Sequence, residues 1–327
     1  MASQKITKRA YCKNAVFLQS GDKQTLQSKM TEALSKMRTV GQRKEEQGDE
    51  HNYVRTIIYH RVVADMLFGI VASFERGTHQ LTVAEDDDAE VLTVEQVAAP
   101  MTDQDKRREF LEGTCYFGIS KNHLVLVSSR ALGAKAVEQH FNWLLQKAGL
   151  LGDEKTPNRV ALSDQVTQVT RERIEAAHVK EVQIGAPLFQ PQETSSGVPG
   201  NEVKAMVYSG LGMDILRQVV GADFLETLHL SDAVDGNIEV SLRVRYKRTT
   251  NTKAQKVLDN IALAMRNLDE DEVKLTLNGG GTVKGHDLKL STALNVEGWD
   301  GVPNPDALFE LMREWLVDLF DNHIIEP

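Results

Sequence analysis

The chain has 327 residues, of which 41% are hydrophobic and 26% are charged, and its formal net charge at pH 7 is −9. This composition excludes disordered and fibrous proteins, and no apolar run approaches the roughly 20 residues that a membrane-spanning helix needs. The length predicts about two domains, and the basic start without a signal-type apolar core predicts a cytoplasmic protein.

Cysteine and histidine usage argues against a metal centre. The two cysteines, Cys12 and Cys115, do not form a closely spaced pair of the kind that binds zinc or performs redox chemistry, and the nine histidines are scattered singly. We therefore expect no metal site and no cofactor.

The net charge hides a strong asymmetry along the chain. Residues 1–44 contain ten basic residues and two acids, a balance of +8, whereas residues 297–327 contain eight acids and one arginine, a balance of −7. Charge that is segregated in this way creates separate surface fields, and a basic field could attract a polyanion.

In the first half, apolar residues at helical spacing predict an amphipathic helix over 25–37 with its lysines on a solvated face. The charged stretch 41–52 is expected to be an exposed loop. Strand-like runs follow at 53–63, 67–74 and 79–84, with a turn at Arg76 and Gly77 and an acidic surface loop at 85–90.

A hairpin and a helix complete this half. The runs GTCYFGIS (113–120) and HLVLVSS (123–129) are separated by Lys121 and Asn122, which predicts a two-residue turn. The next segment, 133–149, has Val137, Phe141 and Leu144 on one side of a helix that ends at Gly149.

Residues 153–200 are rich in proline, glycine and serine, which predicts a linker or hinge containing a short helix at 169–179 and a strand at 179–188. The expected division is thus an N-terminal domain at 1–152, a linker at 153–200 and a C-terminal domain at 201–327.

The second half is expected to contain helices at 210–221 and 251–268 and strands at 237–248, 271–278 and 286–296, with a glycine-rich turn at 279–285. A last amphipathic helix starts at Pro305 and Asp306, and its apolar stripe is open to two interpretations, core packing or a dimer contact. The predicted fold class is α+β: two α+β lobes with mostly antiparallel sheets and a C-terminal amphipathic helix. The stripe consists of Leu308, Leu311, Met312, Trp315, Leu316 and Leu319.

The segment SLRVRYKRTTNTKAQK (241–256) concentrates basic residues without any acid. Because strand side chains alternate, Arg243, Arg245 and Lys247 share one face. Where the next helix begins, side-chain hydroxyls and free backbone N–H groups suit an anion. The basic side chains can neutralise phosphates without reading bases. A solvated strand face is the equally weighted alternative. The predicted DNA-binding residues are Arg243, Arg245, Lys247, Arg248, Lys253 and Lys256, with Lys274 and Lys284 as an extension of the same surface.

Catalytic motifs give little support for an enzyme. NGGGTVKG (278–285) fails as a phosphate-binding P-loop because Lys284 is followed by glycine and no helix opens there, so a hairpin turn is expected. Glu272 and Lys274 form the second half of a metal-nuclease pattern, but no acidic partner upstream is evident. We assign no catalytic residue, and a metal-dependent nuclease stays an alternative.

Several segments resemble the RexA-like phage-exclusion family. These are GMDILRQVVGADFLE, SLRVRYKRTTNTKAQKVLDNIA, VKLTL and HDLKLSTALNVEG with the terminal helix, and in the first half EGTCYFGISKNHLVLVSSRALGA. The resemblance, which extends broadly to RdgC-type DNA-binding proteins, implies a homodimer that binds duplex DNA with little sequence preference, has no catalysis of its own and acts with a membrane-protein partner in excluding superinfecting phage. The basic extension at residues 1–50 departs from that family.

The leading hypothesis is therefore a cytoplasmic, sequence-nonspecific double-stranded DNA-binding protein that acts in anti-phage defence without a small-molecule substrate. The alternatives are a metal-dependent nuclease using Glu272 and Lys274, and a protein-interaction adaptor whose basic residues 1–44 meet an acidic protein or an anionic membrane surface.

Overall fold

A computed structural model describes residues 4–17, 24–48, 52–83, 94–102, 104, 107–152, 158–187, 190–191, 206–207, 239–245 and 273–325. The chain divides into two compact units, a larger one formed by Met1–Gln168 with Lys289–Pro327 and a smaller one formed by Val169–Leu288. This division differs from the predicted one, because residues 289–327 belong with the N-terminal half of the chain and not with the C-terminal domain.

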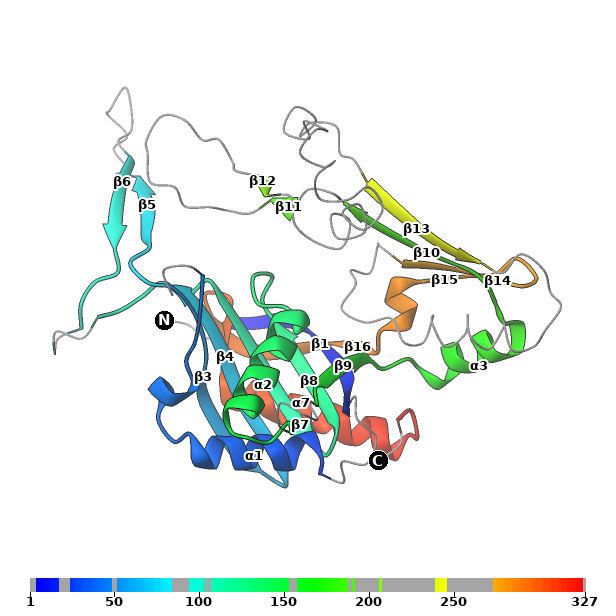
Figure 1. Ribbon diagram of the computed structural model, residues 1–327, viewed down its shortest axis with the longest axis horizontal. Coiled ribbons are helices and arrows are strands. Elements are labelled where there is room, and N and C mark those ends of the chain that lie inside the picture. The colour runs from blue at the N-terminus through cyan, green and yellow to red at the C-terminus, as the bar shows by residue number, and fades with distance from the viewer. Residues whose placement is uncertain are drawn as a thin grey trace. The chain divides into compact units, whose positions relative to one another are not determined.

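A nine-stranded sheet organises the larger unit, in the order β17-β16-β1-β8-β7-β4-β3-β2, with β9 paired to the second half of β1 (Figure 1). Among the described residues, the neighbouring strands of this sheet are paired antiparallel. Its strands are β1 (Gln4–Phe17), β2 (Glu45–Gln47), β3 (Tyr53–Val63), β4 (Met66–Glu75), β7 (Gly113–Ser120), β8 (His123–Ser128), β9 (Val160–Asp164), β16 (Ser291–Trp299) and β17 (Val302–Pro303).

Helices cover both faces of this sheet. On one face, α1 (Leu26–Lys36) and α2 (Ala134–Lys147) pack onto a core that includes Phe117. On the other face, α7 (Pro305–Asp321) packs onto a second core that includes Phe68. Because strand side chains alternate between faces, the central strands β4, β7 and β8 supply apolar residues to both cores, which explains their continuous hydrophobic runs.

The N-terminal basic segment is part of this scaffold. Strand β1 lies between β16 and β8, and α1 buries the apolar positions expected from its spacing. Three of the basic side chains are buried: Lys13 pairs with Asp164 at 2.6 Å, Lys29 donates to the Leu150 carbonyl at 2.8 Å, and Arg43 donates to backbone carbonyls including that of Ile57. The expectation of a solvated lysine face thus fails for Lys29.

The C-terminal helix begins where the sequence predicted. Pro305 occupies the first turn and the Asn304 side chain accepts hydrogen bonds from the backbone N–H groups of Asp306 and Ala307, which satisfies donors that the helix start leaves open. The apolar stripe is buried or partly buried against the large sheet, so core packing, the first of the two interpretations, is confirmed.

Other predicted elements of the larger unit are present. The β7–β8 hairpin turns at Lys121, which has φ 52°, and β5 (His79–Val83) pairs with β6 (Val94–Ala98) in a separate two-stranded sheet. The stretch 41–52 is not simply a loop, because it forms a 3-10 helix η1 (Val40–Arg43) and the edge strand β2. The acidic loop 85–90 lies outside the described residues.

The smaller unit is a four-stranded antiparallel sheet in the order β13-β10-β14-β15 (Figure 1). Ile174 of the helix α3 packs with the apolar side of this sheet. The elements are α3 (Gln168–Ala177), β10 (Val179–Pro187), β13 (Glu239–Arg245), β14 (Val273–Leu277), β15 (Thr282–Lys284) and a 3-10 helix η4 (Gly285–Leu288), and a separate pair is formed by β11 (Gln190–Pro191) and β12 (Met206–Val207).

The predicted class is confirmed: this is an α+β protein with antiparallel sheets and a C-terminal amphipathic helix. The predicted helices at 210–221 and 251–268 lie outside the described residues. None of the helices in the described ranges has the length and apolar character needed to span a membrane.

Candidate nucleic-acid interface

The outer face of the four-stranded sheet gathers basic residues from three strands. Direct cross-strand pairing aligns Arg243 of β13, Gln183 of β10, Lys274 of β14 and Lys284 of β15 in one row. Directly paired residues in a sheet point to the same side, so these four side chains share a face. We call this set the basic row.

A second row lies two residues further along the same face. It consists of Arg245, Glu181, Thr276 and Thr282, again in direct cross-strand register. The two rows contain four cations, one carboxylate and several neutral hydrogen-bonding groups. Because adjacent strands are about 4.8 Å apart, the basic row spans about 14 Å from β13 to β15, a distance over which a nucleic-acid backbone presents several phosphates.

The opposite face of the sheet is apolar, which fixes the orientation of the rows. Val182, Leu275 and Val283 are buried in the core of the smaller unit together with Ile174 of α3, and Val244 packs against them. The alternation in LRVRYKR therefore has the predicted effect in the described part of the strand: Val244 faces inward and Arg243 and Arg245 face outward.

The electrostatics of the basic row are unbalanced. Lys274 and Lys284 are exposed and lie directly opposite each other, and neither side chain has an ion-pair partner among the described residues. Like charges in direct cross-strand pairs destabilise a sheet. An anion placed between the two ammonium groups would relieve this repulsion.

Arg243 has an internal acid. Its Nε lies 3.1 Å from Oε1 of Glu181, and the two side chains are 54% and 19% exposed. This ion pair is accessible to solvent and thus weak, so a phosphate could compete for the guanidinium. Glu181 also pairs in register with Arg245, which places this one carboxylate between two arginines.

Four of the eight predicted DNA-binding residues are thus brought together: Arg243, Arg245, Lys274 and Lys284. The other four, Lys247, Arg248, Lys253 and Lys256, lie outside the described residues. The sequence reasoning missed β10, which inserts between β13 and β14 and supplies Glu181 and Gln183. The sequence did predict a strand at 179–188. Because this strand was assigned to the linker, its pairing with β13 and β14 was not predicted.

The glycine-rich segment contains the expected hairpin turn, but the turn is shorter than predicted, because Thr282–Lys284 form the strand β15. The Leu277 carbonyl accepts a hydrogen bond from the Gly280 N–H, and the Leu277 N–H donates to the Gly281 carbonyl. Gly279 and Gly280 have φ values of 92° and 93°, which residues with a side chain rarely adopt. The turn holds β14 and β15 in the register that opposes Lys274 and Lys284.

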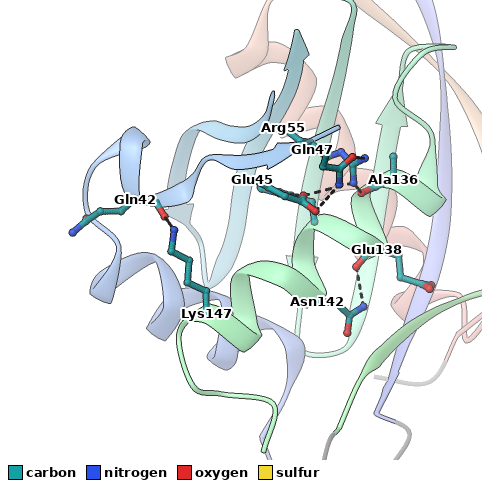
Figure 2. Close-up of polar contacts among 9 residues, drawn as sticks. Gln42, Glu45, Gln47, Arg55, Ala136, Glu138, Asn142 and Lys147 are labelled. Carbon is teal, nitrogen blue, oxygen red and sulfur yellow. Dashed lines mark hydrogen bonds and ion pairs between the residues drawn. The ribbon is translucent and has the colours of Figure 1, made fainter. Parts of the chain in front are cut away.

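A buried polar cluster in the larger unit was not anticipated at all (Figure 2). Glu45 of β2 accepts from Gln47 at 2.7 Å and lies 2.8 Å from Nδ1 of His140 on α2. Arg55 of β3 donates to the Ala136 carbonyl at 2.7 Å and to Gln47 at 3.2 Å. These contacts join the edge strand β2 and the strand β3 to α2.

The protonation states in this cluster follow from burial and from the partners. Burial, aided by the charge of Arg55, lowers the pKa of His140 despite the nearby carboxylate. Burial acts to raise the pKa of Glu45, but the hydrogen bond and charge of His140, together with Arg55 and Gln47, outweigh it and lower the pKa. A neutral His140 thus donates from Nδ1 to an ionised Glu45, and its Nε2 is buried without a hydrogen-bond partner in the described part of the chain.

Neither cysteine has the features of a reactive thiol. Cys12 and Cys115 are both buried, and burial raises the pKa of both thiols, to about 12 for Cys12. Over the described ranges, no three His, Cys, Asp or Glu side chains gather in a way that could hold a metal ion. Glu272, the acid of the nuclease alternative, lies outside those ranges.

A comparison with protein-family models finds no match, and neither does a comparison with curated protein sequences. The candidate interface therefore stands on the geometry of the smaller unit.

Proposed function

We propose that this chain binds double-stranded DNA without sequence preference, through contacts between phosphates and the outer face of the four-stranded sheet, and that it has no catalytic activity of its own. The observation that carries this proposal is the basic row, in which Lys274 and Lys284 oppose each other without an acidic partner among the described residues. The alternative is a solvated strand face on which these cations bind no ligand.

Two features support phosphate rather than base recognition. The cations come from separate strands of a rigid sheet, so they present charge along a line and do not form a projecting element that could enter a groove. Thr276, Thr282 and Gln183 add neutral donors to the same face. Contacts of these types position a protein on the backbone and carry no sequence information.

The role in anti-phage defence and the membrane-protein partner are part of the proposal through the resemblance to the RexA-like family. A defence role is tested in a host strain that expresses the chain alone or together with a candidate membrane-protein partner, by counting plaques of a superinfecting phage. Equal plaque numbers in all strains would remove the defence role and leave DNA binding untouched.

The DNA-binding proposal is tested by replacing Arg243 and Arg245 with glutamate and titrating labelled duplex DNA with the purified protein. We expect the variant to lose measurable binding and to stay folded with a somewhat lower melting temperature, because both exposed glutamates would lie beside Glu181. Unchanged affinity would contradict the assignment of the site. Incubation with plasmid and Mg²⁺ or Mn²⁺ separates binding from cutting, because the proposed protein retards the plasmid without cleaving it.

A further inference from the structure

One end of the strand β3 forms an open edge of the large sheet. The short strand β2 pairs only with residues 53–55 of β3, and Arg43 of η1 covers the Ile57 carbonyl. Across the described part of the chain, no backbone group pairs with residues 58–63 from the side away from β4. Three large apolar side chains on this stretch are exposed: Ile58 at 41%, Tyr59 at 38% and Val62 at 55%.

Such an edge is unusual because unpaired strands invite association, and proteins commonly cover them, shorten them or charge them. This edge has one cation, Arg61, and that side chain already pairs with Asp306 at 2.8 Å. The stretch therefore lacks the excess positive charge that a nucleic acid or an anionic membrane would require. Its chemistry fits an apolar protein strand.

We propose that the open edge of β3 is the interface at which two copies of this chain pair as antiparallel strands about a two-fold axis centred on His60. A two-fold interface must be self-complementary, and this register meets that condition. Ile58 faces Val62 of the second copy, and Tyr59 faces Arg61 of the second copy, each pair occurring twice. No two like charges are directly opposed.

The side chains of β3 are already arranged for this pairing. Tyr59 and Arg61 both lie against Phe309 of α7, with the ring centroids of Tyr59 and Phe309 6.2 Å apart and the Arg61 guanidinium 5.6 Å from the Phe309 centroid. They therefore share the α7 side, where a tyrosine and an arginine of the second copy make a favourable cation–π pair. A β-bulge at residues 57–59 leaves Ile58 unpaired with β4, and bulges of this kind re-aim side chains at sheet edges.

The central residue, His60, is compatible with close approach of its symmetry mate. Nη1 of Arg43 lies 3.2 Å from Nε2 of His60, so the imidazole accepts there and is neutral. Other registers are less favourable: centring the axis on Arg61 would oppose two guanidinium groups directly, which destabilises a strand pair. The pairing joins the two nine-stranded sheets into one, and the proposal does not depend on DNA binding by the smaller unit.

The experiment measures self-association of the full-length chain by sedimentation over a range of protein concentrations. We expect the wild-type chain to dimerise and Val62→Lys to raise the dimer dissociation constant at least about tenfold, which corresponds to about 1.4 kcal/mol. Val302→Lys is the matched control, because Val302 lies on β17 at the opposite edge of the same sheet and is 58% exposed. A monomeric wild-type chain, or equal effects of the two lysines, would overturn the proposal.

Cysteine cross-linking tests the register separately. Directly opposed residues of antiparallel strands have Cα atoms about 4.5–5.5 Å apart, within the range that a disulfide spans. His60→Cys should therefore form a covalent dimer without reductant. Val62→Cys should not, because residue 62 and its symmetry mate would lie about 14 Å apart along the strands. Cys12 and Cys115 are buried and do not interfere. Efficient cross-linking through Val62→Cys, or none through His60→Cys, would refute this register.

Discussion

The salt dependence of DNA binding gives the most quantitative test of the basic row. We consider replacing Lys274 and Lys284 together with alanine, because they oppose each other and have no ion pair of their own among the described residues. If each cation neutralises one phosphate of duplex DNA, each contributes about 0.9 to the slope of the logarithm of the binding constant against the logarithm of salt concentration. The four cations of the two rows then contribute a slope of about −3.6.

The double variant should therefore show a slope that is less steep by about 1.8. A rise in salt from 50 to 200 mM would weaken the binding contributed by all four cations about 150-fold. In the double variant, where only Arg243 and Arg245 are left, the same rise would weaken their contribution about 12-fold. The difference in slope does not depend on how many further cations contact DNA. The free protein should be no less stable, because the substitution removes a repulsive pair.

Fluorescence anisotropy with a labelled duplex at five or more salt concentrations measures these slopes. Arg130→Ala, which removes an exposed arginine of the larger unit, is the control and should keep the wild-type slope. A double variant with an unchanged slope would show that phosphates do not contact Lys274 and Lys284. An equal decrease in the slope per charge for Arg130→Ala would show that the effect reflects the net charge of the protein and not contacts at this sheet.

Three further predictions concern single residues. Glu181→Gln should strengthen DNA binding by about two- to fivefold in the same assay, because the Arg243 guanidinium loses a competing carboxylate worth up to about 1 kcal/mol; weaker binding would mean that Glu181 orients Arg243. The free energy of unfolding should fall as pH drops below about 6.5, the ordinary pKa of histidine, because the folded state lowers the pKa of His140 and the unfolded state takes up the proton first. Urea titrations should show that His140→Gln reduces this pH dependence, by at most about 1.4 kcal/mol per pH unit, and an identical pH profile would exclude His140 as its source. Lys13→Ala should destabilise the larger unit by about 3 to 5 kcal/mol, because it leaves Asp164 buried without its partner; a small loss of stability with weaker DNA binding would instead make Lys13 a ligand-binding residue.

Local patterns predicted individual elements well. The periodicity of the segment 25–37, the two-residue turn at Lys121 and the Pro-Asp start of α7 all lie within one element, and the structure has them where the sequence indicated. Strand alternation alone predicted that Arg243 and Arg245 lie on the same face of their strand, opposite its apolar residues. In each case the determining interactions are close in sequence.

Long-range pairing could not be predicted in this way. The stretch 41–52 is rich in charged residues, but Glu45 is buried because His140 and Arg55, far away in the sequence, satisfy its carboxylate. The sequence predicts that the segment 286–296 is the strand that follows 271–278 in the C-terminal domain, yet β16 pairs with β1. Sequence order also placed β14 next to β13, whereas β10 lies between them.

The pairing of β16 with β1 and the packing of α7 on the same sheet have a consequence for synthesis of the chain. On the ribosome, the larger unit cannot complete its sheet until residues 289–325 have emerged, long after its other strands have been made. Until then, the face that α7 covers, with Phe68 and Tyr116, is exposed to solvent and to other nascent chains. The smaller unit, contained in one continuous segment, can fold first and bring the two ends of its segment together, which shortens the search of the last strand for β1. Chains that terminate early should accordingly aggregate or be degraded, and should not yield a functional fragment.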